Sequence, residues 1–129
     1  MKQPGENKLH IMIIDDDPGT IKVLSLILSN AGHTVTAHTE CGPGFLQTGS
    51  FPDLLLLDNQ VGAISGADLC LQLKQEPGTA HIPVILLSGI DNLEEIARAC
   101  GADDYISKPF CIKELMDKID LLTPIKTTA

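Results

Sequence analysis

The chain is poor in aromatic and in basic residues. Only 3% of its 129 residues are aromatic and none is tryptophan, while nine Lys and Arg residues stand against 17 Asp and Glu, for a net charge of −8. A surface with that charge repels phosphate backbones, and too few rings are present to stack on bases. We therefore expect no direct nucleic-acid binding by this segment.

Long apolar runs and paired cysteines are also missing. No stretch approaches the roughly 18 apolar residues of a membrane span, and residues 1–8 lack the apolar core of a signal peptide. No two of the four cysteines are spaced as a C-x-x-C pair, which argues against a zinc or redox motif. We expect a cytoplasmic protein without membrane contact, whose cysteines are reduced and mostly buried thiols, Cys41, Cys70, Cys100 and Cys111.

What the chain does have is a buried strand that ends on a carboxylate. Residues 54–57 are four consecutive leucines, bounded by Pro52 and Gly62 and followed directly by Asp58. The run is too short for a typical helix and lacks alternation, so it predicts a strand buried on both faces. The length of the chain fits one domain. We assign 1–8 to a polar extension, 9–123 to the domain and 124–129 to a tail or the start of a linker.

Strand-like and helix-like segments alternate along this domain. Apolar runs and turn residues predict strands at 9–14, 33–39, 54–58, 84–87 and 105–107, of which 33–39 is the least apolar and suits a sheet edge. Helical spacing predicts helices at 18–31, 67–75, 92–100 and 112–122, with a short helix within 42–49. We expect Asn92 to be the N-cap of the helix at 92–100 and Gly101 to end it. This alternation is typical of a doubly wound α/β fold with a parallel sheet and helices on both faces.

Four predicted strands end on polar residues, which should therefore meet at one edge of the sheet. The first runs into Asp15, Asp16 and Asp17, the third ends on Asp58, the fourth precedes Ser88 and the fifth precedes Lys108. Crowded carboxylates cost energy unless a cation is bound or some of them stay protonated, and a site with few hard oxygen ligands suits Mg²⁺. With Mg²⁺ on Asp16 and Asp58, Lys108 and Ser88 are able to bind phosphoryl oxygens, and Asp58 becomes a plausible nucleophile toward phosphorus.

Four segments resemble the signature positions of response-regulator receiver domains of two-component signalling, in the same order and at matching separations. The resemblance covers residues 9–122 and implies a flavodoxin-like sheet with strand order 2-1-3-4-5. It implies that Asp58 accepts a phosphoryl group from a phosphohistidine of a sensor histidine kinase or phosphotransfer protein. It also implies that Asp15, Asp16, Asp58 and the Gln60 carbonyl hold Mg²⁺, that Lys108 forms a salt bridge, and that Ser88 and Tyr105 form the switch pair. The segments are Ile13 to Asp16, Leu56 to Asp58, Leu86 to Gly89 and Lys108 to Phe110.

The resemblance further implies a signalling phosphoacceptor, which assists only its own phosphorylation and dephosphorylation and is not an enzyme. The helix at 92–100, the strand at 105–107 and the final helix would change shape and control an output partner or domain, and a homodimer through that face is a further expectation. Val61-Gly62 replaces the usual Met-Pro, so we expect a more mobile loop and a less rigid metal site. Ile90 cannot orient an attacking water, so we expect a long-lived phosphoryl state.

Three alternatives come from other classes. The first is a haloacid-dehalogenase-like phosphatase, whose motifs are loosely similar to Asp15, Asp17, Ser88 and the acidic pair at 103–104. Two features argue against it: Lys108 follows the acidic pair instead of preceding it, and 129 residues leave no room for a cap domain. A flavodoxin-like nucleotide or flavin binder lacks a Gly-rich phosphate loop. The third is a docking module that is never phosphorylated. Such a module has no need of a complete phosphorylation site, so the presence of all five site residues argues against it: Asp15, Asp16, Asp58, Ser88 and Lys108. Asp17 by itself is best explained as a helix cap.

Overall fold

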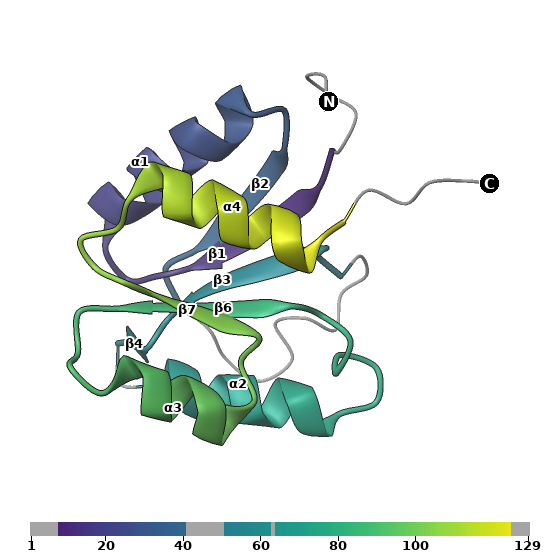
Figure 1. Cartoon of the computed structure of the whole chain (residues 1–129), viewed down its shortest axis with the longest axis vertical. Helices are drawn as coiled ribbons and strands as arrows, with labels where there is room; N and C mark the ends of the chain where they lie inside the picture. The colour runs from purple at the N-terminus through teal and green to yellow at the C-terminus, as the bar shows by residue number, and fades with distance from the viewer. Residues whose placement is uncertain (1–7, 41–50, 63, 125–129) are drawn as a thin grey trace.

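The fold is a five-stranded parallel sheet between two pairs of helices. A computed structural model describes residues 8–40, 51–62 and 64–124. Helices α1 and α4 cover one face of the sheet, and α2 and α3 cover the other (Figure 1). The elements in chain order are β1 (His10–Ile14), α1 (Pro18–Asn30), β2 (Thr34–His38), β3 (Leu54–Asp58), β4 (Gln60–Val61), β5 (Ile64–Ser65), α2 (Gly66–Gln75), β6 (Val84–Ser88), α3 (Leu93–Cys100), β7 (Asp104–Ser107) and α4 (Ile112–Leu122).

The sheet has the order β2-β1-β3-β6-β7, with every neighbouring pair parallel. Strands β4 and β5 form a separate antiparallel hairpin, so β6 and β7 are the fourth and fifth strands of the main sheet. The predicted flavodoxin-like order 2-1-3-4-5 is therefore confirmed. The prediction that the strand at 33–39 lies at an edge is also confirmed, because among the described strands β2 pairs only with β1.

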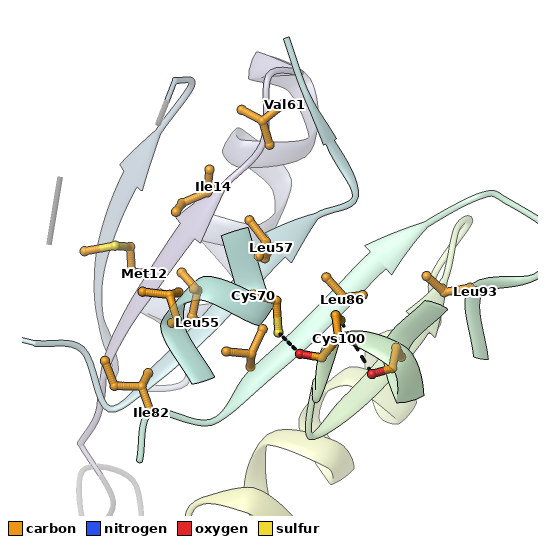
Figure 2. Close-up of a cluster of buried hydrophobic side chains, with 13 residues drawn as sticks. Met12, Ile14, Leu55, Leu57, Val61, Cys70, Ile82, Leu86, Leu93 and Cys100 are labelled. Atoms are coloured by element: carbon orange, nitrogen blue, oxygen red, sulfur yellow. Dashed lines mark hydrogen bonds between the residues drawn. The ribbon is translucent and has the colours of Figure 1, made fainter. Parts of the chain in front are cut away.

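The central strands contribute to two separate apolar cores. Leu55 and Leu57 pack with the residues of α2 and α3, in the cluster of Figure 2. Leu54 and Leu56 point to the opposite face and pack with residues of α1 and α4. Because strand side chains alternate between faces, four consecutive leucines supply both cores at once, and each buried leucine contributes on the order of 2 kcal/mol. The two cores fix the orientation of Asp58 at the end of β3.

Most helix ends lie where the sequence predicts them. Asp17 is the N-cap of α1, its side chain accepts from the N–H of Gly19, and Pro18 is the first helical residue. Helix α3 ends at Gly101, which has φ of +78° and so needs glycine's conformational freedom. Asn92 occupies the predicted N-cap position of α3, but its side chain makes no capping hydrogen bond, so that part of the prediction is wrong.

The β4–β5 hairpin was not expected from the sequence, which indicated only a loop after Asp58. Its strands have two residues each, too few to show any periodicity. The predicted helix within 42–49 lies outside the described residues, as do most of the predicted extension and tail. Of the helices in the described ranges, none combines the length and the apolar character that crossing a bilayer requires.

Cys70 and Cys100 are buried thiols that face each other across α2 and α3, whereas Cys111 is exposed. The Cys70 thiol donates to the Cys100 carbonyl oxygen at 3.5 Å, and burial together with the neighbouring Cys100 raises the pKa of Cys70 to about 12 (Figure 2). The predicted free thiols are confirmed for these three residues and their predicted burial for two, while Cys41 lies outside the described residues.

This difference in exposure predicts selective alkylation of the native protein. Iodoacetamide should label Cys111 at least about 100-fold faster than Cys70 or Cys100, because a thiol reacts as its thiolate and a buried thiol must first be exposed by unfolding. Timed labelling followed by peptide mapping by mass spectrometry measures the three rates. Labelling in denaturant is the control and should make all three equally reactive. Native Cys70 reacting as fast as Cys111 would contradict the packing of α2 against α3.

Candidate functional site

Polar side chains gather where four parallel strands end on the same side of the sheet. Asp15 and Asp16 follow β1, Asp58 is the last residue of β3, Ser88 is the last residue of β6, and Lys108 follows β7. The register keeps these ends level, because Ile14 pairs with Leu57, Asp58 with Leu87, and Ser88 with Ser107. The parallel topology therefore brings these residues together at one edge of the sheet, as expected.

Lys108 connects two of the carboxylates. Its Nζ donates to Asp15 Oδ2 at 2.9 Å and to Asp58 Oδ1 at 3.1 Å. The Asp15 side chain is 3% exposed and the Asp58 side chain 13%, so both carboxylates are largely shielded from solvent, whereas the Lys108 side chain is 26% exposed. Asp15 Oδ1 also accepts the N–H of Asp17 at 2.9 Å. Lys108, which follows β7, thus links carboxylates contributed by two other strands, β1 and β3.

Burial and Lys108 shift the pKa of Asp58 in opposite directions. Burial raises the pKa of Asp58 above the usual aspartate value, and the hydrogen bond and charge of Lys108 oppose that rise only in part. Burial by itself would lower the pKa of Lys108, but its hydrogen bonds to Asp15 and Asp58 outweigh that effect and raise it. The cluster therefore combines three carboxylates with one firmly protonated ammonium group.

The carboxylates are close enough to bind one metal ion together. One oxygen each from Asp15, Asp16 and Asp58 lie within 4.8 Å of one another. Asp15 is buried, Asp58 partly buried and Asp16 exposed, so the group is open to solvent on one side. Three hard oxygen donors with room for water suit Mg²⁺ better than a softer ion, and they fit the metal that the sequence predicts.

Ser88 and Tyr105 lie on neighbouring strands but not at the same level. Ser88 is 7% exposed, and its Oγ accepts the N–H of Ile90 at 3.4 Å. Tyr105 pairs with Leu86, two residues earlier in β6, and the Lys118 Nζ lies 4.8 Å from the centre of its ring. The same ammonium group pairs with Asp104 at 3.0 Å and donates to the Tyr105 carbonyl oxygen. Lys118 of α4 was not predicted as a site residue, since only the folded chain brings it beside Tyr105.

The loop after Asp58 contributes two backbone contacts that sequence reasoning missed. The sequence predicts only that the Gln60 carbonyl is a Mg²⁺ ligand, but in the structure the Gln60 N–H also donates to Asp58 Oδ2 at 3.3 Å. The Gly62 N–H donates to Asp16 Oδ2 at 3.1 Å. Gly66 packs directly on the Asp58 backbone, because a Cβ there would lie 2.0 Å from the Asp58 carbonyl oxygen. For Gly62 and Gly66, the only signal in the sequence is the presence of glycine at those positions.

Replacing Lys108 with Met should lower the free energy of unfolding by about 2 kcal/mol, because it leaves two shielded carboxylates without their cation. Chemical denaturation in Mg²⁺-free buffer measures the change. Lys113→Met is the matched control, since it removes an exposed ion pair with Asp117 and should cost less than about 0.5 kcal/mol. Equal losses in the two variants would mean that the Lys108 pairs are no stronger than surface pairs.

Comparison with known proteins identifies one family along nearly the whole domain. The family model described as the response regulator receiver domain matches residues 11–120. Over 115 residues, the chain is 33% identical to the DNA-binding dual master transcriptional regulator RpaA of Synechocystis sp. strain PCC 6803. That match covers 87% of this chain and 48% of RpaA, and the chain spans about half the length of several curated relatives.

Solved structures agree with the sequence relatives. The signal receiver domain of a signal transduction histidine kinase from Syntrophus aciditrophicus is 31% identical, with a TM-score of 0.80 over 94% of this chain and 95% of that one. A CheY-like response regulator receiver domain protein from Methanospirillum hungatei JF-1 is 26% identical, with a TM-score of 0.78 over 88% of this chain and 92% of that one. The fold and the sequence motifs thus lead to the same family.

Proposed function

The chain belongs to the response regulator receiver domain family of two-component signalling, and from this we propose that Asp58 is the phosphoacceptor of a Mg²⁺-dependent switch. The observation that carries the proposal is the Asp58 carboxylate at the end of β3, beside two further carboxylates and one ammonium group. Members of this family are signalling phosphoacceptors, and we do not expect this chain to turn over a substrate as an enzyme does.

The proposed reaction is transfer from a phosphohistidine. An Asp58 oxygen attacks phosphorus, the bond from phosphorus to the histidine nitrogen breaks, and the electron pair stays on that nitrogen, which takes up a proton. Lys108 lies 3.1 Å from Asp58 Oδ1, where its ammonium group can bind an oxygen of the incoming phosphoryl group. Ser88 can donate its hydroxyl to another oxygen. The donor would be a sensor histidine kinase or a phosphotransfer protein.

The residues that would hold Mg²⁺ are Asp15, Asp16 and Asp58, with the Gln60 carbonyl as a further ligand. When bound, the ion supplies positive charge that counters the phosphoryl oxygens and the three carboxylates. The chain's own residues position the reacting groups. Asp15 anchors Lys108, Asp58 presents the attacking oxygen, and the hydrogen bonds of the loop after Asp58 hold the carboxylates in place.

The proposed output is a population shift between two arrangements of the domain. Phosphoryl oxygens bound by Ser88 and Lys108 would favour the arrangement in which Tyr105 turns inward and the surface of α3, β7 and α4 changes. That surface would control an output partner or domain, and we expect a homodimer to form through it. The relatives include a transcriptional regulator and a kinase receiver domain, so the kind of output varies among proteins with this fold.

The segment itself is proposed to act in the cytoplasm and without binding nucleic acid or membrane. Its net charge of −8 opposes contact with a phosphate backbone. RpaA is named as a DNA-binding regulator, but this chain covers only 48% of the length of that protein.

The test is the intact mass of the protein after incubation with acetyl phosphate, with Mg²⁺ or with a chelator in its place. We expect the gain of one phosphoryl group only when Mg²⁺ is present. Slow loss of that group after the donor is removed would agree with the prediction made from Ile90. A folded protein that gains no mass under either condition would favour the docking module instead.

A further inference from the structure

The loop after Asp58 donates backbone N–H groups to two different carboxylates of the cluster. The Gln60 N–H lies 3.3 Å from Asp58 Oδ2, and the Gly62 N–H lies 3.1 Å from Asp16 Oδ2. Val61, between them, is only 3% exposed and belongs to the core shared with α2 and α3. Since Asp16 is itself exposed, this contact from the loop holds a carboxylate that solvent would otherwise leave free to rotate.

Several contacts fix the Gly62 backbone. The Gln60 side chain donates from Nε2 to the Gly62 carbonyl oxygen at 2.8 Å, and Gln60 and Val61 pair with Ser65 and Ile64 across the hairpin. Gly62 has φ of +61°, a conformation that favours glycine, and a Cβ at this position would meet nothing within 4 Å. The requirement for glycine is therefore conformational rather than a matter of space.

From this geometry we infer that Gly62 is a positioning residue for Asp16, secured by the Gln60 side chain. The inference rests on the proposed Mg²⁺ site. A hydrogen bond to one oxygen restricts the carboxylate, so less entropy is lost when Asp16 binds the cation, and such outer contacts are typically worth 10- to 100-fold in metal affinity. A proline, the residue that usually stands here in the family, has no N–H and cannot form this bond.

The first experiment measures the Mg²⁺ dissociation constant by calorimetric titration without any phosphodonor. Gln60→Met keeps the length of the side chain but removes the donor to the Gly62 carbonyl, and it should raise the dissociation constant about tenfold. Gln72→Met is the matched control, because Gln72 is an exposed residue of α2 and is not part of the β4–β5 hairpin, and the dissociation constant of this variant should equal that of the wild type. Thermal unfolding in Mg²⁺-free buffer should show that both variants remain folded.

The second readout is the amide proton resonance of Gly62. Asp16→Asn replaces a charged acceptor with a neutral one, so the Gly62 amide proton should move upfield, while the Gly78 amide proton, in a distant loop, should stay in place. A Gly62 amide that does not move would show that the hydrogen bond is absent and would overturn the inference.

The outcomes separate this inference from the function on which it rests. A wild-type protein that binds no Mg²⁺ would overturn both. A wild-type protein that binds Mg²⁺ and is phosphorylated, together with a Gln60→Met variant of unchanged dissociation constant, would overturn the positioning role alone, whatever the Gly62 amide does. A tenfold weaker Gln60→Met variant with an upfield Gly62 amide in Asp16→Asn supports it.

Discussion

Asp58→Asn is expected to abolish the gain of a phosphoryl group completely. An amide in place of the carboxylate has no charged oxygen to attack phosphorus, and no other residue of the cluster is both partly exposed and bonded to Lys108 as Asp58 is. The measurement is intact-protein mass after incubation with acetyl phosphate and Mg²⁺. Asp68→Asn, an exposed aspartate in the first turn of α2, is the matched control and should be labelled like the wild type.

The variant should remain folded, which makes the loss of label informative. Lys108 keeps its ion pair with Asp15, and removing one of three neighbouring carboxylates relieves repulsion, so the melting temperature should stay the same or rise. Label that survives in Asp58→Asn but disappears in Asp15→Asn would refute this assignment and favour the phosphatase alternative. Label that survives in both would place the acceptor elsewhere.

Gly66→Ala is expected to lower the free energy of unfolding by about 3 kcal/mol. A Cβ at this position would lie 2.0 Å from the carbonyl oxygen of Asp58 and 2.9 Å from the Cα of Asn59. Both are backbone atoms, so the clash cannot be relieved by turning a side chain. The Gly66 N–H also donates to the Asn59 carbonyl oxygen at 2.6 Å, and the movement needed to admit a methyl group would disturb that bond.

Urea denaturation of Gly66→Ala and Gly78→Ala tests this prediction. A Cβ at Gly78 would meet nothing within 4 Å, so this control should change the free energy of unfolding by less than about 0.5 kcal/mol. Phosphorylation of Gly66→Ala should also be slower, because the backbone that must shift carries Asp58. Equal stabilities of the two variants would show that the turn after β3 is looser than its geometry indicates.

The sheet was predictable because its signals are local. Four leucines between a proline and an aspartate indicate a strand buried on both faces, and strands alternating with helices fix the fold class. The N-cap at Asp17 and the helix end at Gly101 follow from the conformational preferences of those residues. The side chain of Asn92 was a weaker case, since an N-cap residue can occupy its position without bonding to the helix.

The candidate site was predictable in its members but not in its contacts. Polar residues at the ends of parallel strands must lie at one edge, so the grouping of Asp15, Asp58 and Lys108 follows from topology. The bonds from Gly62 to Asp16 and from Lys118 to Tyr105 depend on how a hairpin and a helix pack, and no spacing in the chain records them. The close approach of Gly66 to Asp58 likewise exists only after the turn has formed.

The ammonium group of Lys118 beside the Tyr105 ring has a practical spectroscopic consequence. Tyr105 is the only tyrosine of the chain, and there is no tryptophan. The tyrosine emission and most of the near-ultraviolet absorbance of the unlabelled protein therefore arise from one ring, whose electronic environment includes a positive charge 4.8 Å from its centre. Any rearrangement that separates the ring from that charge will alter the emission of this single chromophore, so the native chain contains its own optical reporter of β7 and α4.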